Sequence, residues 1–241
     1  MSRPPFETPK PETAERGAPR EGQPQSVDAR LFMQLLVFSG CTRTQPLIVA
    51  LKSSGLDAVL YEDANDPRGV ALLTFDRDPA HFVTRVRLLL QAEPFASLQL
   101  RPEFTMIGRT YALGHEANLQ DWLFDKPRKT VLNTAMSWAV WYPLRRKGEF
   151  MRLPDDERGK ILMEHAKIGM SYVMHDLGHD VRLASHGLDQ NDSDFVIGLI
   201  GKELAYLSKM VEAMRRTTQT SQYIERLGPF FVGRVAYQSN V

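Results

Sequence analysis

The chain has 241 residues, of which 43% are hydrophobic, and its 30 Lys and Arg residues nearly balance its 29 Asp and Glu residues. This length is typical of two domains of ordinary size, and a near-neutral charge favours neither nucleic acid nor a lipid surface as a partner. The single cysteine, Cys41, excludes an internal disulfide, and no stretch resembles a signal-peptide core or a membrane span, so we expect a cytoplasmic protein.

Residues 1–27 are rich in Pro, Glu, Arg and Gly and contain almost no large apolar side chains. A segment of this composition cannot bury enough apolar surface to offset the entropy lost on ordering. The sequence therefore predicts a disordered tail whose removal leaves the stability of the protein unchanged.

Residues 28–112 show the patterns of four strands and two helices in the order βαββαβ. A turn at 66–69 separates the second strand from the third. The predicted strands are 31–38, 57–62, 70–75 and 104–109, and the predicted helices are 46–53 and 79–91.

The same order recurs in residues 137–241, after a connecting segment at 113–136 that contains a basic turn at 126–129. Both halves end on a Phe-rich stretch with a Gly-Arg pair and a Tyr, which suggests a duplication. We therefore predict an α+β fold of two ferredoxin-like halves that form a barrel-like unit. The predicted strands are 138–143, 181–186, 195–200 and 230–235, and the predicted helices are 154–177 and 203–215.

The first helix of the second half carries a histidine, His165, on its apolar stripe with Ile161, Ile168 and Tyr172. The corresponding helix of the first half, 46–53, has no side chain that binds a metal. A histidine on an apolar stripe is commonly a core residue bonded to a carbonyl, so its position alone leaves that alternative open.

Five motifs of the second half, taken in order, resemble the chlorite dismutase-like family of haem proteins, which includes the coproheme decarboxylases. The first half matches this family mainly in its element order and its closing Gly-Arg pair. The motifs are Trp141–Lys147, Leu153–Arg158, Met163–His165, Gly187–Asp189 and Gly228–Gly233.

The resemblance implies that His165 is the proximal ligand of a haem iron, as a neutral imidazole. Its second ring nitrogen then needs an acidic or carbonyl partner. Tyr142 stands where the decarboxylases have a radical-forming tyrosine, although a half-buried strand aromatic is the ordinary alternative. Arg146 matches a propionate anchor of those enzymes, and Arg128 stands near the place of another.

Two places depart from the family pattern. Members that decompose chlorite carry a tryptophan pair where this chain has Phe150 and Met151, which argues against chlorite chemistry. Alternation along 180–186 sends Arg182 and His186 to one face of the strand. Arg182 is the first candidate for the distal residue above the iron and His186 the second.

The resemblance therefore predicts an oxidoreductase that converts coproheme to haem b with hydrogen peroxide, in a homo-oligomer that is a pentamer in the family. A chlorite dismutase or haem peroxidase, a haem carrier or sensor without turnover, and a barrel that binds no porphyrin remain the alternatives. A non-haem metal site at His175, Asp176 and His179 lacks further ligands at a recognisable spacing.

Overall fold

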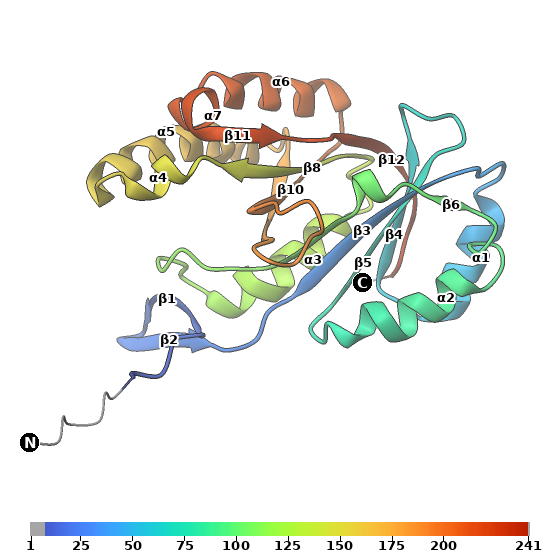
Figure 1. Ribbon diagram of the computed structural model, residues 1–241, viewed down its shortest axis with the longest axis horizontal. Helices are drawn as coiled ribbons and strands as arrows, with labels where there is room; N and C mark the ends of the chain where they lie inside the picture. Colours follow the sequence, from blue (N-terminus) through green and yellow to red (C-terminus); the bar gives the residue numbers. More distant parts are fainter. Residues whose placement is uncertain (1–7, 241) are drawn as a thin grey trace, which may run out of the picture.

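Eight antiparallel strands close into a barrel in the computed structural model, which describes residues 8–240 (Figure 1). The strands follow one another around the barrel as β7, β3, β5, β4, β12, β8, β10 and β9, and β9 meets β7 again at Arg109 and Ala184. Each half of the chain contributes four strands in the spatial order fourth, first, third, second. The predicted α+β class is confirmed, and the structure shows one large antiparallel sheet.

The first half contains the predicted strands and helices with small shifts of their ends. Its first helix begins with Pro46 in the first turn and ends before Gly55, which has a positive φ of 61°. The second predicted helix begins with a π-helical turn, Phe82–Val86, and continues as α2, Arg87–Gln91. The other elements are β3 Phe32–Ser39, α1 Gln45–Ser54, β4 Ala58–Asp63, β5 Val70–Asp76, β6 Gln99–Leu100 and β7 Met106–Arg109.

The second half likewise follows the predicted order, with additional short elements. Its longest helix, α5, is Asp155–Met174, and the helices α5 and α6 cover the same side of the sheet (Figure 1). The other elements are β8 Trp138–Arg146, α4 Gly148–Arg152, β9 His179–Ala184, β10 Phe195–Gly201, α6 Leu204–Arg215, α7 Thr218–Tyr223, β11 Ile224–Leu227 and β12 Phe231–Gln238.

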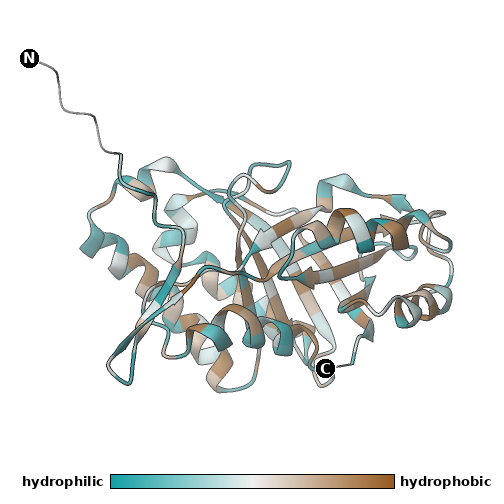
Figure 2. Cartoon of the chain, turned by 90° about the horizontal axis from the view of Figure 1, so that it is seen from below, coloured by the Kyte–Doolittle hydropathy of each residue, from teal (hydrophilic) through white to brown (hydrophobic). Residues whose placement is uncertain are grey.

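The barrel interior forms the largest hydrophobic core and draws on both halves, with Met33, Tyr61 and Trp141 among its fully buried side chains. Apolar colours accordingly concentrate on the central strands, whereas the helices turn polar residues outward (Figure 2). Within residues 8–240, no helix combines the length and the apolar character that crossing a membrane requires.

The connecting segment is more regular than the sequence indicated. The basic run at 126–129 is not a turn but part of a helix, α3 Lys126–Val131, which follows a π-helical turn at Asp121–Asp125. The helix forms because Leu123 and Phe124 bury one face of this segment against the barrel core, and tertiary packing outweighs the turn-like composition.

The prediction of a disordered tail is wrong for residues 15–27, which form a hairpin of β1, Glu15–Arg20, and β2, Gln23–Val27. Residues 1–7 lie outside the described residues. The hairpin has few apolar side chains, but Glu15 forms ion pairs with Arg30 and Arg109 and is only 14% exposed. Polar contacts with the rest of the chain therefore order a segment that composition assigns to disorder.

Deleting residues 1–27 should consequently lower the melting temperature by several degrees, opposite to the expectation from composition. Hydrogen bonds to charged groups contribute about 1.5–3 kcal/mol each, and 1 kcal/mol shifts the melting temperature of a chain of this size by about 2–4 °C. Scanning calorimetry measures the shift. Glu12→Ala is the control, because Glu12 pairs only with the exposed Arg16 and such pairs contribute little. An unchanged melting temperature after the deletion would contradict the docking of the hairpin.

Candidate functional site

Tyr142 and Arg182 lie on the same outer face of the second half's sheet. Tyr142 on β8 stands opposite Ile197 on β10, which in turn stands opposite Arg182 on β9. Directly opposed residues in neighbouring strands project to the same side, and two strand spacings separate the ends of this row by about 10 Å. The same alternation places Asp180 on this face, as the sequence predicted.

Helix α5 lies over this face and carries His165 toward it. The helix begins after Pro154 with three acidic residues in its first turn, where they interact favourably with the helix dipole. Of its 20 residues only Ile161 is fully buried, and His165 is half-buried. Helix α1 in the first half, by contrast, buries both Leu47 and Leu51 completely in ten residues. The apolar stripe of α5 is thus incompletely covered by the protein itself.

The hydrogen bonds around His165 assign its tautomer. Its Nδ1 lies 3.3 Å from Oγ1 of Thr217, and that hydroxyl lies 2.8 Å from the carbonyl oxygen of Met214. A carbonyl only accepts, so the hydroxyl proton points to Met214 and Oγ1 accepts from the Nδ1–H of His165. The Nε2 atom is then unprotonated and its lone pair is free to bind a metal.

The pKa of His165 is lowered from its ordinary value. Burial is the main cause, and the positive charges of Arg146 and Arg182 add to it, while Asp180 and Glu164 act in the opposite direction. The neutral imidazole that a metal requires is therefore the favoured form at neutral pH. The direction of these effects indicates that the charges of Arg146 and Arg182 both act on the imidazole of His165.

Arg146, at the end of β8, is a partly buried cation that forms no ion pair among residues 8–240. Its guanidinium carbon lies 4.6 Å from the ring centre of Phe195 and 4.9 Å from that of Phe150. Its Nε atom is buried without a hydrogen-bond partner, and no carboxylate among residues 8–240 forms an ion pair with it. Burial lowers the pKa of its guanidinium, although an arginine stays protonated near neutral pH. The carboxylate of Asp194 acts on this charge in the favourable direction but forms no ion pair with it. A partly buried cation without an ion-pair partner is costly, so this position is suited to an anionic ligand.

Arg182 is held in place by two neighbours. Its Nε forms an ion pair with the carboxylate of Asp180 at 2.9 Å, and its guanidinium carbon lies 5.2 Å from the ring centre of Trp122. Beside it is a cavity of about 30 Å³, which Tyr111, Trp122, Lys126 and Arg182 help to line. A cavity of this size holds a water molecule or a ligand of few atoms.

Tyr142 is 8% exposed and stacks on Phe230, with ring centres 4.5 Å apart. Burial, reinforced by the negative charge of Asp180, raises the pKa of its phenol far above the ordinary value. The hydroxyl is therefore protonated at any physiological pH. Oxidation of such a phenol therefore removes both an electron and the hydroxyl proton.

Two sequence-predicted residues lie outside this cluster. His186 follows the end of β9; its side chain is 57% exposed, and its Nδ1 lies 3.3 Å from Asp194, whose carboxylate also accepts from the backbone N–H of Arg146. It belongs to the rim beside Arg146 rather than to the sheet face. Arg128 lies on α3 and forms two hydrogen bonds with Asp57, at 3.0 and 3.1 Å. The structure does not bring Arg128 to the cluster, because a carboxylate of the first half already neutralises it.

The alternative metal site on the sequence also receives no support. His179 pairs with Asp176 at 2.9 Å, and Nδ1 of His175 contacts the carbonyl of Ser171 at 2.8 Å. Among the residues that the structure describes, no group of three His, Cys, Asp or Glu side chains is arranged to hold a metal ion.

Sequence reasoning missed three residues of the site: Thr217, Tyr111 and Trp122. Thr217 lies 52 positions from His165 and contacts it only because α7 returns beside α5. Tyr111 follows the Gly-Arg pair that both halves share, so that motif marked the segment without indicating its role. Trp122 lies in the connecting segment, where no periodic pattern indicated a contact with Arg182.

A comparison with protein families matches the sequence profile of the chlorite dismutase family to residues 89–236. The matched part exceeds half of the chain and includes the helix of His165 and the strands of Tyr142 and Arg182. The chain therefore belongs to the chlorite dismutase family, a family of haem proteins. A search of curated proteins finds no match.

Solved structures show the same fold at low sequence identity. A chlorite dismutase from Candidatus Nitrospira defluvii in complex with imidazole is 14% identical, with a TM-score of 0.65 over 88% of this chain and 93% of that chain. A variant of the same enzyme in complex with cyanide is 13% identical, with a TM-score of 0.66 over 88% of this chain and 92% of that chain. At these identities the likeness extends to the fold alone.

Replacing Arg146 by Gln should raise the pKa of His165, because it removes a positive charge that disfavours the imidazolium. Titration of the ring nitrogens by two-dimensional NMR of the haem-free protein measures this pKa. Arg145→Gln is the matched control, since Arg145 is paired with Asp192 and Glu225. An equal response to both substitutions would contradict the shared environment of His165 and Arg146.

The lowered pKa also fixes the sign of a stability effect. Between the native and unfolded pKa values the unfolded chain binds more protons, so the contribution of His165 is present above about pH 6.5, the unfolded value, and declines as the pH falls toward the native value.

Proposed function

We propose that this protein is a haem-binding oxidoreductase that decarboxylates coproheme to haem b with hydrogen peroxide. The observation that carries the proposal is the partly buried guanidinium of Arg146, which forms no ion pair within residues 8–240 and whose charge acts on His165. An iron porphyrin that carries propionate groups supplies an anion for Arg146 and a metal ion for His165.

The donor set fits such a ligand. His165 has an unprotonated Nε2 and a hydrogen-bonded Nδ1, which is the arrangement that fixes a metal-binding imidazole. Arg146 offers a planar fork to a carboxylate, and the incompletely covered stripe of α5 offers apolar surface to a porphyrin face. The partner of His165 is a neutral hydroxyl rather than a carboxylate, so it gives the imidazole less anionic character than an acidic partner would.

The reaction consumes one peroxide for each propionate. A propionate side chain, one hydrogen peroxide and one proton give a vinyl group, carbon dioxide and two waters; the side chain loses two electrons, and the peroxide is reduced by the same two. When bound, the iron porphyrin supplies the centre that reacts with peroxide. The protein has to hold the propionate in place and provide a route for the hydrogen atom.

Tyr142 is proposed as that route. Its phenol is protonated and buried, stacks on Phe230, and lies on the face that α5 covers. Oxidation of the phenol removes an electron and its proton, and the resulting radical takes a hydrogen atom from the β-carbon of a propionate. The side chain then loses a second electron and carbon dioxide, and the electron pair of the broken C–C bond completes the vinyl group. Asp180 and Arg182 form an ion pair on the same face of the sheet, and the charge of Asp180 acts on the phenol of Tyr142.

A second activity in the same pocket is favoured by one observation. Arg182 and Lys126 line the small cavity against the single carboxylate of Asp180, and the resulting excess of positive charge favours an anionic oxidant such as chlorite over neutral peroxide. Phe150 and Met151, where chlorite-decomposing members have tryptophans, weigh against it. A haem carrier without turnover would leave the buried phenol of Tyr142 without a role. An oxygen-electrode assay with chlorite separates the first two activities.

We also propose that residues 28–112 and 137–241 are ferredoxin-like halves that arose by duplication, with 113–136 connecting them. The same strand order in both halves supports this. A homopentamer is what membership of the family suggests, and sedimentation analysis tests it.

The substitution Tyr142→Phe should stop conversion while leaving binding intact. Phenylalanine keeps the ring that packs on Phe230 but removes the oxidisable hydroxyl, so coproheme affinity should change little and the formation of haem b should fall by orders of magnitude. Optical titration measures the affinity, and chromatography of the extracted porphyrins after peroxide addition measures the product.

Two controls frame that experiment. Tyr206→Phe alters an exposed tyrosine of α6 and should leave conversion unchanged. His165→Ala should abolish or grossly weaken porphyrin binding. A wild-type protein that binds coproheme but forms no haem b would overturn the decarboxylase proposal, and an active Tyr142→Phe variant would overturn only the role of Tyr142.

The substitution Arg146→Ala should weaken coproheme binding by about tenfold to a hundredfold, because a charge-assisted contact contributes about 1.5–3 kcal/mol. The loss should be smaller for haem b, which has two propionates fewer. Arg145→Ala is the matched control, since Arg145 is adjacent in the sequence and its guanidinium is already paired with acidic side chains. If the affinities for coproheme and haem b fell equally, Arg146 would have no role in the preference for coproheme.

A further inference from the structure

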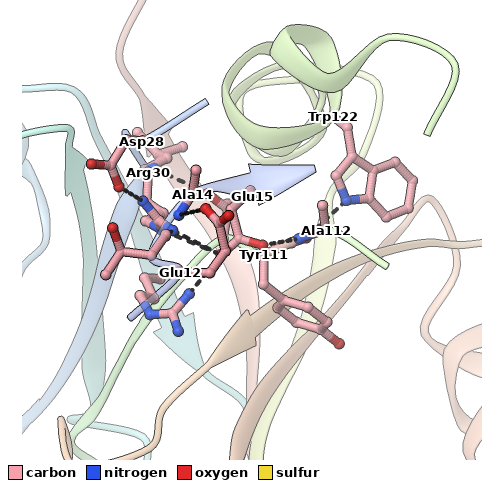
Figure 3. Close-up of polar contacts among 12 residues, drawn as sticks. Glu12, Ala14, Glu15, Asp28, Arg30, Tyr111, Ala112 and Trp122 are labelled. Carbon is pink, nitrogen blue, oxygen red and sulfur yellow. Dashed lines mark hydrogen bonds and ion pairs between the residues drawn. The ribbon is translucent and has the colours of Figure 1, made fainter. Parts of the chain in front are cut away.

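The first strand of the N-terminal hairpin holds the chain just after β7 through one carboxylate (Figure 3). Glu15 accepts hydrogen bonds from Arg109 Nη1 at 3.0 Å and from Arg30 Nε at 3.3 Å through one oxygen, and from the backbone N–H of Ala112 at 2.9 Å through the other. Its side chain is 14% exposed. Charge-assisted bonds of this kind are among the stronger polar contacts in proteins. Without the carboxylate, the two guanidinium groups would repel each other.

The second strand of the hairpin holds the following residues. The side-chain amide of Gln25 donates to the carbonyl oxygens of Glu116 and Ala117, at 3.1 and 3.2 Å, and accepts from the N–H of Leu119 at 3.0 Å. The backbone approaches as well, since Ala18 N–H donates to the Glu116 carbonyl at 3.1 Å. Residues 112–119 are therefore fixed by the hairpin at both ends.

This segment carries the wall of the cavity beside Arg182. Tyr111 directly precedes Ala112, and Trp122 lies three residues after Leu119. Both Tyr111 and Trp122 line the cavity. The indole Nε1–H of Trp122 donates to the carbonyl of Tyr111 at 2.9 Å, so the two parts of the wall are linked (Figure 3). A shift of Ala112 therefore moves both aromatic side chains relative to the guanidinium of Arg182.

We propose that Glu15 is a positioning residue for the ligand pocket, because it fixes the wall of Tyr111 and Trp122 beside Arg182. The inference rests on the proposed function, since it assumes that a small anion or peroxide reaches a haem iron on this side. The hairpin touches neither His165 nor Arg146 in the described contacts, so Glu15 governs the small ligand and not the porphyrin.

The experiment compares Glu15→Ala and Gln25→Ala with two reference variants. Glu15→Gln keeps an acceptor for the Ala112 N–H but loses the charge, so it should fall between wild type and Glu15→Ala. Glu12→Ala is the matched control, because Glu12 precedes the same hairpin and its carboxylate pairs with the exposed Arg16 and accepts from the nearby N–H of Ala14.

Hydrogen exchange of the haem-free protein is the first measurement. Amides of residues 110–119 should exchange about tenfold faster or more in Glu15→Ala and Gln25→Ala, as expected when charge-assisted or multiple hydrogen bonds that close a segment are lost. Helix α5 should exchange as in the wild type, which distinguishes a local opening from a general loss of stability.

Binding of cyanide to the ferric haem-loaded protein is the second measurement. The cyanide dissociation rate should increase severalfold in Glu15→Ala and Gln25→Ala, partly recover in Glu15→Gln, and stay unchanged in Glu12→Ala. Haem affinity should remain at the wild-type value in all four, since His165 and Arg146 are untouched. A purely structural defect would weaken haem and cyanide binding together.

The failures of the two proposals differ. A wild-type protein that binds no haem overturns the proposed function and with it the role of Glu15 in ligand binding. Normal haem binding with unchanged exchange at 110–119, or with the same cyanide dissociation rate in Glu15→Ala and Glu12→Ala, overturns the role of Glu15 alone.

Discussion

The packing of Trp141 against Gly198 inside the barrel determines which residues face helix α5. Trp141 is completely buried, and a Cβ atom at Gly198 would lie 2.5 Å from its indole ring, so only glycine fits opposite it. Side chains alternate along a strand, and a shift of one residue between β8 and β10 would turn Tyr142 inward. The apolar contact inside the barrel thereby keeps Tyr142 and Arg182 together on the outside, where the polar chemistry lies.

The outer face of the second half's sheet combines an apolar surface with two arginines that differ in how they are paired. The charges of Arg146 and Arg182 both act on His165, but in the part of the chain that the structure describes Arg182 alone of the two forms an ion pair, with Asp180. One cation is thus neutralised within the protein and oriented by its partner, while the other is left to an external anion. This division fits a ligand that brings carboxylates to the end of β8 and leaves the Arg182 side to a smaller molecule.

Regular elements with periodic apolar residues could be predicted from the sequence, and so could the position of His165 on α5, because a helix start at Pro154 and a stripe at helical spacing are local signals. Contacts between distant segments could not. The hairpin at 15–27 is ordered by Glu15 and Gln25, whose partners lie about ninety positions along the chain, and composition carries no record of them. Arg128 failed for the same reason, because the nearby basic residues gave no indication that Asp57 would neutralise it.

The two halves use the same strand order, yet only the second offers a site, and the difference lies in how each first helix packs. Helix α1 is short and buries Leu47 and Leu51 against its sheet, so the protein itself covers the apolar stripe of this helix. Helix α5 is twice as long, buries one residue fully, and is tied to α7 through Glu164 and His165 instead. Holding a helix by polar contacts at its flank, rather than by its apolar stripe, frees that stripe for a ligand. The first half then contributes indirectly, since the chain that leaves β7 carries Tyr111 to the second half's pocket, and the hairpin that precedes β3 holds it there.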